Sequence, residues 1–206
     1  MTQFWMPRDW AVAVCLLALG LSTTFVVRAS DTPPSQATTR ILDGIEKVRS
    51  KLSQEDRRAA HRLNANGDRA YRKGNYSEAD TYYENSYPNF PNARAYIMTG
   101  DSAWRAAVQF QESEVLKPEN RPPACAWDNS YFARDLMLDV AQHQEVGLAL
   151  AKRENDRRLL RSELYRRARE SATCLHDVAK FYEAQPKTAC VDIVKMRNCL
   201  GSPLFK

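Results

Sequence analysis

One stretch of 34 residues, 60–93, constrains the fold of this chain more than any other. It reads AHRLNANGDRAYRKGNYSEADTYYENSYPNFPNA. Gly74 and Asn75 stand near its middle, and both residue types tolerate the left-handed backbone with which helices often end. Pro88 and Pro91 follow near its close, where proline stops a helix. The stretch therefore predicts two short antiparallel helices joined by a tight turn.

Small and aromatic side chains occupy the positions at which these two helices must pack closely. Gly67 on the first helix and Ala79 on the second are expected to face each other, because small residues let helices approach. Tyr76 would fill the space beneath the turn, and Tyr83 would pack at the junction with the next helix. In these positions, and in Leu63 at the first large apolar place, the stretch resembles a tetratricopeptide repeat.

The resemblance covers one repeat clearly and extends over about a third of the chain that follows the N-terminal segment. Asn66 stands where the repeat has an apolar residue, and Tyr71 comes one place late. Residues 94–116 place Ile97 and Trp104 where a second repeat would have them, but no comparable turn follows. Because roughly three stacked repeats are usual for stability, flanking helices would have to cap this one. An ordinary helical hairpin is the alternative.

A tetratricopeptide repeat presents a concave binding face on its first helix, so the resemblance implies a groove for a peptide or protein. It places on that face His61, Asn64, Ala65, Asp68, Tyr71 and Arg72, and on the following helix Met98, Ser102 and Arg105. Six of these are the expected partner-binding residues: His61, Asn64, Asp68, Tyr71, Arg72 and Arg105. The alternative is that these side chains form a solvated or internally packed face.

Apolar residues at spacings of three and four continue through the rest of the chain, which predicts an all-α protein. A tetratricopeptide-like helical region is expected over 40–116, and a C-terminal helical region over 117–206. The expected helices are 40–52, 53–73 capped by Ser53, 77–86 capped by Ser77, 93–116 capped by Asn92, 128–153 capped by Asp128, 156–184, and 188–200 capped by Thr188. The fold class is therefore all-α, with antiparallel hairpins and a disulfide-linked C-terminal hairpin.

The first 29 residues form an apolar N-terminal segment. Residues 11–27 carry no charge, and a run of 17 residues is short for a membrane span. Val27 and Ala29 are small enough for the recognition positions of a signal peptidase. We predict a cleaved signal peptide; the alternative is a membrane tether through residues 10–27.

Residues 30–39 are polar and contain two consecutive prolines, so a flexible tether is expected there. Behind an export signal, the protein would lie in the periplasm or on the outer face of the inner membrane. A cytosolic location is not expected under either interpretation of the N-terminal segment.

An even number of cysteines in an exported chain predicts two disulfides. The four that follow the N-terminal segment are Cys125, Cys174, Cys190 and Cys199. If the chain folds back at Pro186, Cys174 lies twelve residues before the turn and Cys199 thirteen after it, so these two should pair. Cys125 and Cys190 would form the second bridge. The alternative is a zinc site built from Cys174, His176, Cys190 and Cys199.

The formal net charge of +5 falls short of the excess typical of nucleic-acid-binding proteins, and no nucleic-acid partner is expected. Eight basic residues against three acids lie between Lys152 and Arg169. Arg153, Arg157 and Arg161 would line one face of a helix. That face could contact an acidic polymer, although a solvated helix with internal ion pairs is the simpler interpretation.

The sequence contains no catalytic motif, so no catalytic, cofactor-binding or metal-binding residue is assigned. The leading hypothesis is a non-enzymatic protein–protein interaction module of the cell envelope. One alternative is an envelope enzyme or enzyme subunit with a site in the C-terminal half, at His143, Glu145 and His176. Another is a membrane-tethered structural protein that binds acidic polymer.

Overall fold

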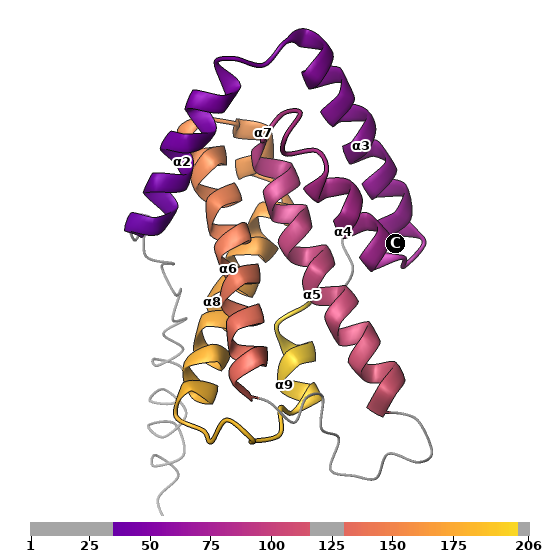
Figure 1. Cartoon of the computed structure of the whole chain (residues 1–206), viewed down its shortest axis with the longest axis vertical. Coiled ribbons are helices and arrows are strands. Elements are labelled where there is room, and N and C mark those ends of the chain that lie inside the picture. Colours follow the sequence, from indigo (N-terminus) through magenta and orange to yellow (C-terminus); the bar gives the residue numbers. More distant parts are fainter. Residues whose placement is uncertain (1–34, 116–129, 202–206) are drawn as a thin grey trace, which may run out of the picture. The chain divides into compact units, whose positions relative to one another are not determined.

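The computed structural model describes residues 35–115 and 130–201, and every structural statement below concerns these ranges. All their regular elements are α-helices, which confirms the all-α class (Figure 1). The helices are α2 (Gln36–Arg49), α3 (Gln54–Arg72), α4 (Tyr76–Glu84), α5 (Ala93–Val115), α6 (Ser130–Arg153), α7 (Arg157–Leu160), α8 (Glu163–Glu183) and α9 (Ile193–Asn198).

Helices α3 and α4 form the hairpin that the sequence predicts. The Ser53 side chain accepts a hydrogen bond from the Asp56 backbone N–H, and the Asp56 carboxylate accepts one from the Ser53 backbone N–H. The Ser53 hydroxyl also donates to the Asp56 carboxylate at 2.7 Å, and this bond, together with the one from the Ser53 backbone N–H, holds the Asp56 pKa below its usual value. Gly74 ends the first helix at a φ of 78°, as expected for a left-handed cap. Helix α4 begins at Tyr76, so the expectation that Ser77 caps it is wrong.

Neighbouring helices pack in chain order, with α3 on α4, α4 on α5, α5 on α6 and α6 on α8. Gly147 of α6 allows a close approach to α5, because a Cβ there would lie 2.6 Å from Ile97 Cγ1. Helix α2 departs from this order and packs on α6. In Figure 1, α2 and α3 diverge from the short connection between them. One side of α3 is therefore left without a preceding helix.

The beginning of α2 corrects the expected tether. The helix starts at Gln36, where a flexible segment was expected through residue 39. The Ser35 hydroxyl caps it by accepting a hydrogen bond from the Thr38 backbone N–H at 3.1 Å. Thr38 is buried, so the end of this segment belongs to the folded unit. The N-terminal segment 1–29, with its signal or tether prediction, lies outside the described residues. No helix in the described ranges is long and apolar enough to cross a membrane.

Two helices of the C-terminal half also differ from expectation. The predicted helix 156–184 is interrupted: α7 ends at Leu160, and Ser162 caps a separate α8 by accepting from the Tyr165 backbone N–H. The last helix begins at Ile193 instead of after Thr188, because Asp192 supplies the cap by accepting from the Val194 backbone N–H. In both places a side-chain cap overrides the continuing periodicity.

Candidate functional site

Most of the predicted concave face is packed inside the protein. Only 9% of Asn64, 2% of Tyr71 and 5% of Arg105 is exposed, and Met98 and Ser102 are fully buried. The prediction that Asn64, Tyr71 and Arg105 contact a partner is therefore wrong. The physical reason for Tyr71 and Arg105 is that Asp101 of α5 and the segment after α9 supply their polar partners. The Asn64 side-chain oxygen and the Ser102 hydroxyl are buried in the described residues without a hydrogen-bond partner.

A buried polar network connects α3, α5 and the C-terminal segment. The Tyr71 hydroxyl donates a hydrogen bond to the Asp101 carboxylate. Arg105 Nε donates to the same carboxylate at 2.8 Å, and Arg105 Nη2 donates to the Leu200 carbonyl at 2.9 Å. Burial alone would lower the Arg105 pKa, but Asp101 and Tyr71 raise it above its ordinary value. The network is a structural connection between three segments.

The remaining predicted residues divide between contacts and solvent. The Asp68 carboxylate accepts hydrogen bonds from the Tyr83 hydroxyl and from Arg94 Nη2, each at 2.7 Å. It is therefore committed to the junction between α3, α4 and α5. His61 and Arg72 are exposed. The structure thus leaves two of the six predicted residues at the surface, and it does not join them to a pocket.

The open cavity lies on another face of α3 and has a volume of about 540 Å³. We call it the α3 groove. It is lined by Ala59, Arg62, Leu63, Ala65, Asn66, Arg69 and Asn89. A smaller adjoining cavity of about 140 Å³ shares Asn66 and Arg69 with it and continues toward Lys73, Glu78 and Tyr82. Of the residues that the sequence placed on the concave face, Ala65 alone lines the α3 groove.

The α3 groove combines an apolar floor with basic walls. Ala59 and Leu63 are half-buried and line the α3 groove. Arg62 and Arg69 are exposed, and Arg69 Nη2 donates a hydrogen bond to the Asn66 side-chain oxygen at 2.5 Å. Apolar surface beside arginine side chains suits a partner that brings apolar and acidic groups together.

The sequence carries a signal for the α3 groove that the repeat pattern conceals. Ala59, Leu63 and Asn66 follow one another at helical spacings of four and three, with Arg62 and Arg69 beside them. This stripe would be covered if a helix preceded α3 in the stack. Because α2 packs on α6, the stripe remains open. Whether the stripe is covered or open therefore depends on where α2 packs, which is a long-range property of the fold.

The basic segment does not form the predicted single face. Helix α6 ends at Arg153, and a positive-φ Asn155 separates it from the four-residue α7. Arg153 contacts Glu46 of α2 at 2.9 Å. Arg157 and Arg161 are exposed at and beyond the ends of α7. The prediction that these three arginines line one face is wrong because the helix breaks between them.

Two other arginines of the basic segment, Arg166 and Arg167, form ion pairs along α8. Arg166 contacts Glu170 at 2.6 Å and also pairs with Glu163. Arg167 contacts Glu163 at 2.6 Å. Hydrogen bonds from Arg166 and Arg167 lower the pKa of Glu163 to about 2. In this part of the segment, exposed acidic and basic side chains therefore pair with one another.

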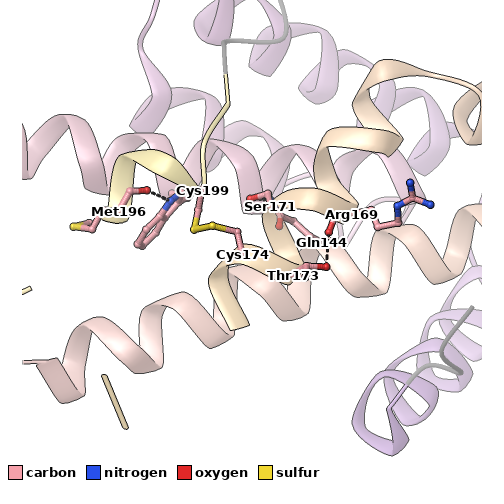
Figure 2. The surroundings of a disulfide bond; sticks show 8 residues. Gln144, Arg169, Ser171, Thr173, Cys174, Met196 and Cys199 are labelled. Atoms are coloured by element: carbon pink, nitrogen blue, oxygen red, sulfur yellow. Dashed lines mark hydrogen bonds between the residues drawn. A yellow bond between two sulfur atoms is a disulfide. The ribbon is translucent and has the colours of Figure 1, made fainter. Parts of the chain in front are cut away.

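A disulfide between Cys174 and Cys199 confirms the predicted pairing (Figure 2). It joins α8 to the end of α9, with the two Cα atoms 5.4 Å apart. Beside it, Trp104 Nε1 donates a hydrogen bond to the Met196 carbonyl at 3.1 Å. A disulfide of this kind indicates an oxidising setting outside the cytoplasm.

The disulfide also removes the zinc alternative, because Cys174 and Cys199 have no free thiolate with which to bind a metal ion. No group of three or more candidate ligands in the described ranges is placed to hold one. Cys190 is disulfide-bonded as well. Its predicted partner, Cys125, lies outside the described residues, so that pairing stays a prediction.

The three residues of the enzyme alternative do not come together as one site. Glu145 of α6 and His176 of α8 contact each other at 2.8 Å. His143 lies apart from them, with its ring centroid 6.4 Å from that of Tyr87 and 6.1 Å from that of Tyr96. The Glu145–His176 pair joins two neighbouring helices on a partly exposed surface.

No protein-family model, no curated protein and no solved structure matches this chain.

Proposed function

We propose that this protein is a non-enzymatic protein–protein interaction module of the cell envelope that binds its partner through the α3 groove. The observation that carries the proposal is the uncovered apolar and basic face of α3, about 540 Å³ in volume. The likeness of residues 60–93 to a tetratricopeptide repeat supports a helix-based binding role. The disulfide supports an exported location, for which the periplasm fits the predicted signal peptide.

The occupant that fits this face is an amphipathic helix of the partner with acidic side chains along its margin. Helix α4 is the one helix of the described ranges that packs extensively against α3, so the open groove on α3 offers the position that a preceding helix would take in a helical stack. From Ala59 to Lys73 the face spans about 21 Å, the length of roughly four helical turns. Leu63 would contact the apolar face of the incoming helix. Arg62 and Arg69 would pair with its carboxylates.

The groove can be tested by comparing the partner captured by wild-type protein and by variants. Leu63→Glu should abolish capture, because it places a charge on the apolar floor. Arg69→Glu should weaken capture at least tenfold, about 1.4 kcal/mol, because it repels an acidic partner. His61→Glu is the matched control, since His61 is an exposed residue of α3 that does not line the groove. Circular dichroism should show unchanged helicity for all three variants.

Two results would overturn the proposal. Capture that survives Leu63→Glu but disappears with His61→Glu would move the binding surface to the face that the repeat resemblance indicates. Capture lost only in an Arg157→Ala/Arg161→Ala double variant, with a loss that shrinks at high salt, would favour an acidic polymer bound near α7.

A further inference from the structure

A row of four basic side chains runs along one margin of the α3 groove. Arg58, Arg62 and Arg69 lie on α3, Lys73 is its C-cap, and all four are exposed. They follow one another at spacings of four, seven and four residues. At 3.6 residues per turn they therefore fall within about 60° of the helix surface. We call these four residues the basic margin.

The basic margin has no acidic partner of its own. Within the described ranges, none of its four side chains forms an ion pair with a carboxylate. Arginines of other helices do form such pairs: Arg94 of α5 pairs with Asp68 at 2.7 Å, and Arg166 of α8 pairs with Glu170 at 2.6 Å. The positive charge of the basic margin is therefore available to an anionic partner.

The opposite wall of the groove differs in charge. It comes from α4 and the connection after it, which contribute Asn89 to the larger cavity and Glu78 and Tyr82 to the smaller one. Glu78 is exposed, and its carboxylate accepts a hydrogen bond from Asn75 Nδ2 at 3.3 Å. One wall is thus basic, while the lining residues of the other are neutral or acidic. A helix lying in the groove would meet positive charge along one flank only.

We propose, on the premise that the α3 groove binds a helix of a partner protein, that this helix carries acidic side chains seven residues apart on a single flank. Residues at that spacing lie about 10 Å apart along a helix axis, which is also the axial separation of Arg62 and Arg69. Each guanidinium can then hold one carboxylate through two hydrogen bonds. The other flank of the partner carries neutral or basic side chains, because Glu78 would repel an acid there.

The shape of the groove favours a helix over a flat anionic surface such as a membrane. Ala59 and Leu63 line a cavity of about 540 Å³ together with Arg62 and Arg69. A side chain of an incoming helix can enter that cavity while its acidic neighbours reach the basic margin. A layer of lipid headgroups would contact the arginines and leave the apolar floor unfilled.

The proposal can be tested with two fluorescent helical peptides of identical composition, by following fluorescence anisotropy. Both carry an apolar stripe. In the first peptide, glutamates seven residues apart flank this stripe, and in the second they lie on the opposite face of the helix. The first peptide should bind the folded, oxidised protein at least tenfold more tightly than the second, because only its carboxylates reach Arg62 and Arg69.

Reversing the charges should exchange the preferred peptide. An Arg62→Glu/Arg69→Glu variant should bind the first peptide at least tenfold more weakly. It should instead bind a third peptide in which lysines replace the glutamates. Arg157→Glu/Arg161→Glu is the matched control, because it changes the net charge equally at exposed positions outside the groove. Circular dichroism should show the helicity of the wild type for both variants.

The outcomes separate the charge register from the groove itself. Equal binding of the first two peptides, with both lost in Leu63→Glu, would overturn the register and leave the groove as the binding site. Failure of the lysine peptide to bind the charge-reversed variant would overturn the register as well. If no peptide bound at concentrations up to about 1 mM, the groove and the register would both be refuted.

A second arm uses sedimentation with vesicles of anionic phospholipid. The wild-type protein should remain in solution. Sedimentation with the vesicles that is lost in Arg62→Glu/Arg69→Glu, together with no difference between the first two peptides, would assign the basic margin to a membrane surface and overturn the proposal.

Discussion

Gly67→Ala is the substitution whose effect follows most directly from the packing of α3 on α4. A Cβ at Gly67 would lie 2.7 Å from Cε1 and 2.8 Å from Cζ of Tyr83. Carbon atoms in contact normally lie about 3.5–4.0 Å apart, so the ring would have to move by nearly 1 Å. The structure therefore corrects the expected neighbour of Gly67 from Ala79 to Tyr83.

The Tyr83 ring has little freedom to move. It is fully buried, and its hydroxyl donates a hydrogen bond to Asp68 at 2.7 Å. Overpacking in such a place typically costs about 1–3 kcal/mol. Replacing glycine by alanine inside a helix returns about 0.5–1 kcal/mol. Gly67→Ala should therefore lower the free energy of unfolding by about 1 kcal/mol.

Gly44→Ala provides the matched control. Gly44 is an exposed glycine inside α2, and a Cβ there would meet nothing within 4 Å. This variant should gain the helix propensity alone, about 0.5–1 kcal/mol. The two variants should then differ by about 2 kcal/mol in urea unfolding of the oxidised protein, because the propensity effect cancels in the comparison.

A double-variant cycle identifies the cause. In a Tyr83→Leu background the ring is absent, so Gly67→Ala should no longer destabilise relative to that background. The reasoning is refuted if Gly67→Ala is as stable as Gly44→Ala, or if the penalty persists after Tyr83 is replaced. Either outcome would mean that α3 and α4 do not approach at Gly67 as the structure describes.

Three further predictions concern other parts of the fold. A Cys174→Ser/Cys199→Ser variant should lose about 3 kcal/mol of stability in urea unfolding, because the bridge closes a loop of 25 residues. Arg105→Ala should lower stability by about 3–5 kcal/mol by leaving Asp101 buried without its ion pair, whereas Arg105→Met with Asp101→Leu should lose clearly less. Because the raised pKa of Asp80 makes the folded state bind a proton more tightly, stability should fall as pH rises from about 4 to 7. Because Asp80 is partly exposed to solvent, this effect is reduced to about 1–2 kcal/mol, and Asp80→Asn should remove it in thermal melts across that range.

Local signals in the sequence predict the helical hairpin well. Ser53, Gly74 and Asn92 act as caps through hydrogen bonds and backbone preferences that span a few residues, and all three do so in the structure. The pairing of Cys174 with Cys199 was predictable for a similar reason, since two helices that fold back at Pro186 bring residues at equal distances from the turn together.

The candidate site was not predictable because it depends on contacts between distant segments. The repeat pattern places Tyr71 on the exposed concave face. In the structure it is buried, and its hydroxyl donates a hydrogen bond to the carboxylate of Asp101, thirty residues later. The α3 groove is open because α2 packs on α6 and leaves α3 uncovered. Neither the burial of Tyr71 nor the direction of α2 follows from the periodicity of either segment alone.

The disulfide and the buried polar network act on the same short segment. Cys199 is bonded to Cys174 of α8, and the next residue, Leu200, accepts a hydrogen bond from Arg105 through its carbonyl. The bridge therefore holds in place the acceptor that completes the environment of Arg105. Arg105 in turn neutralises the charge of Asp101, whose carboxylate also accepts a hydrogen bond from the Tyr71 hydroxyl of α3. An oxidising setting thus stabilises the inner face of α3, while the α3 groove, through which we propose that a partner binds, lies on another face of the same helix.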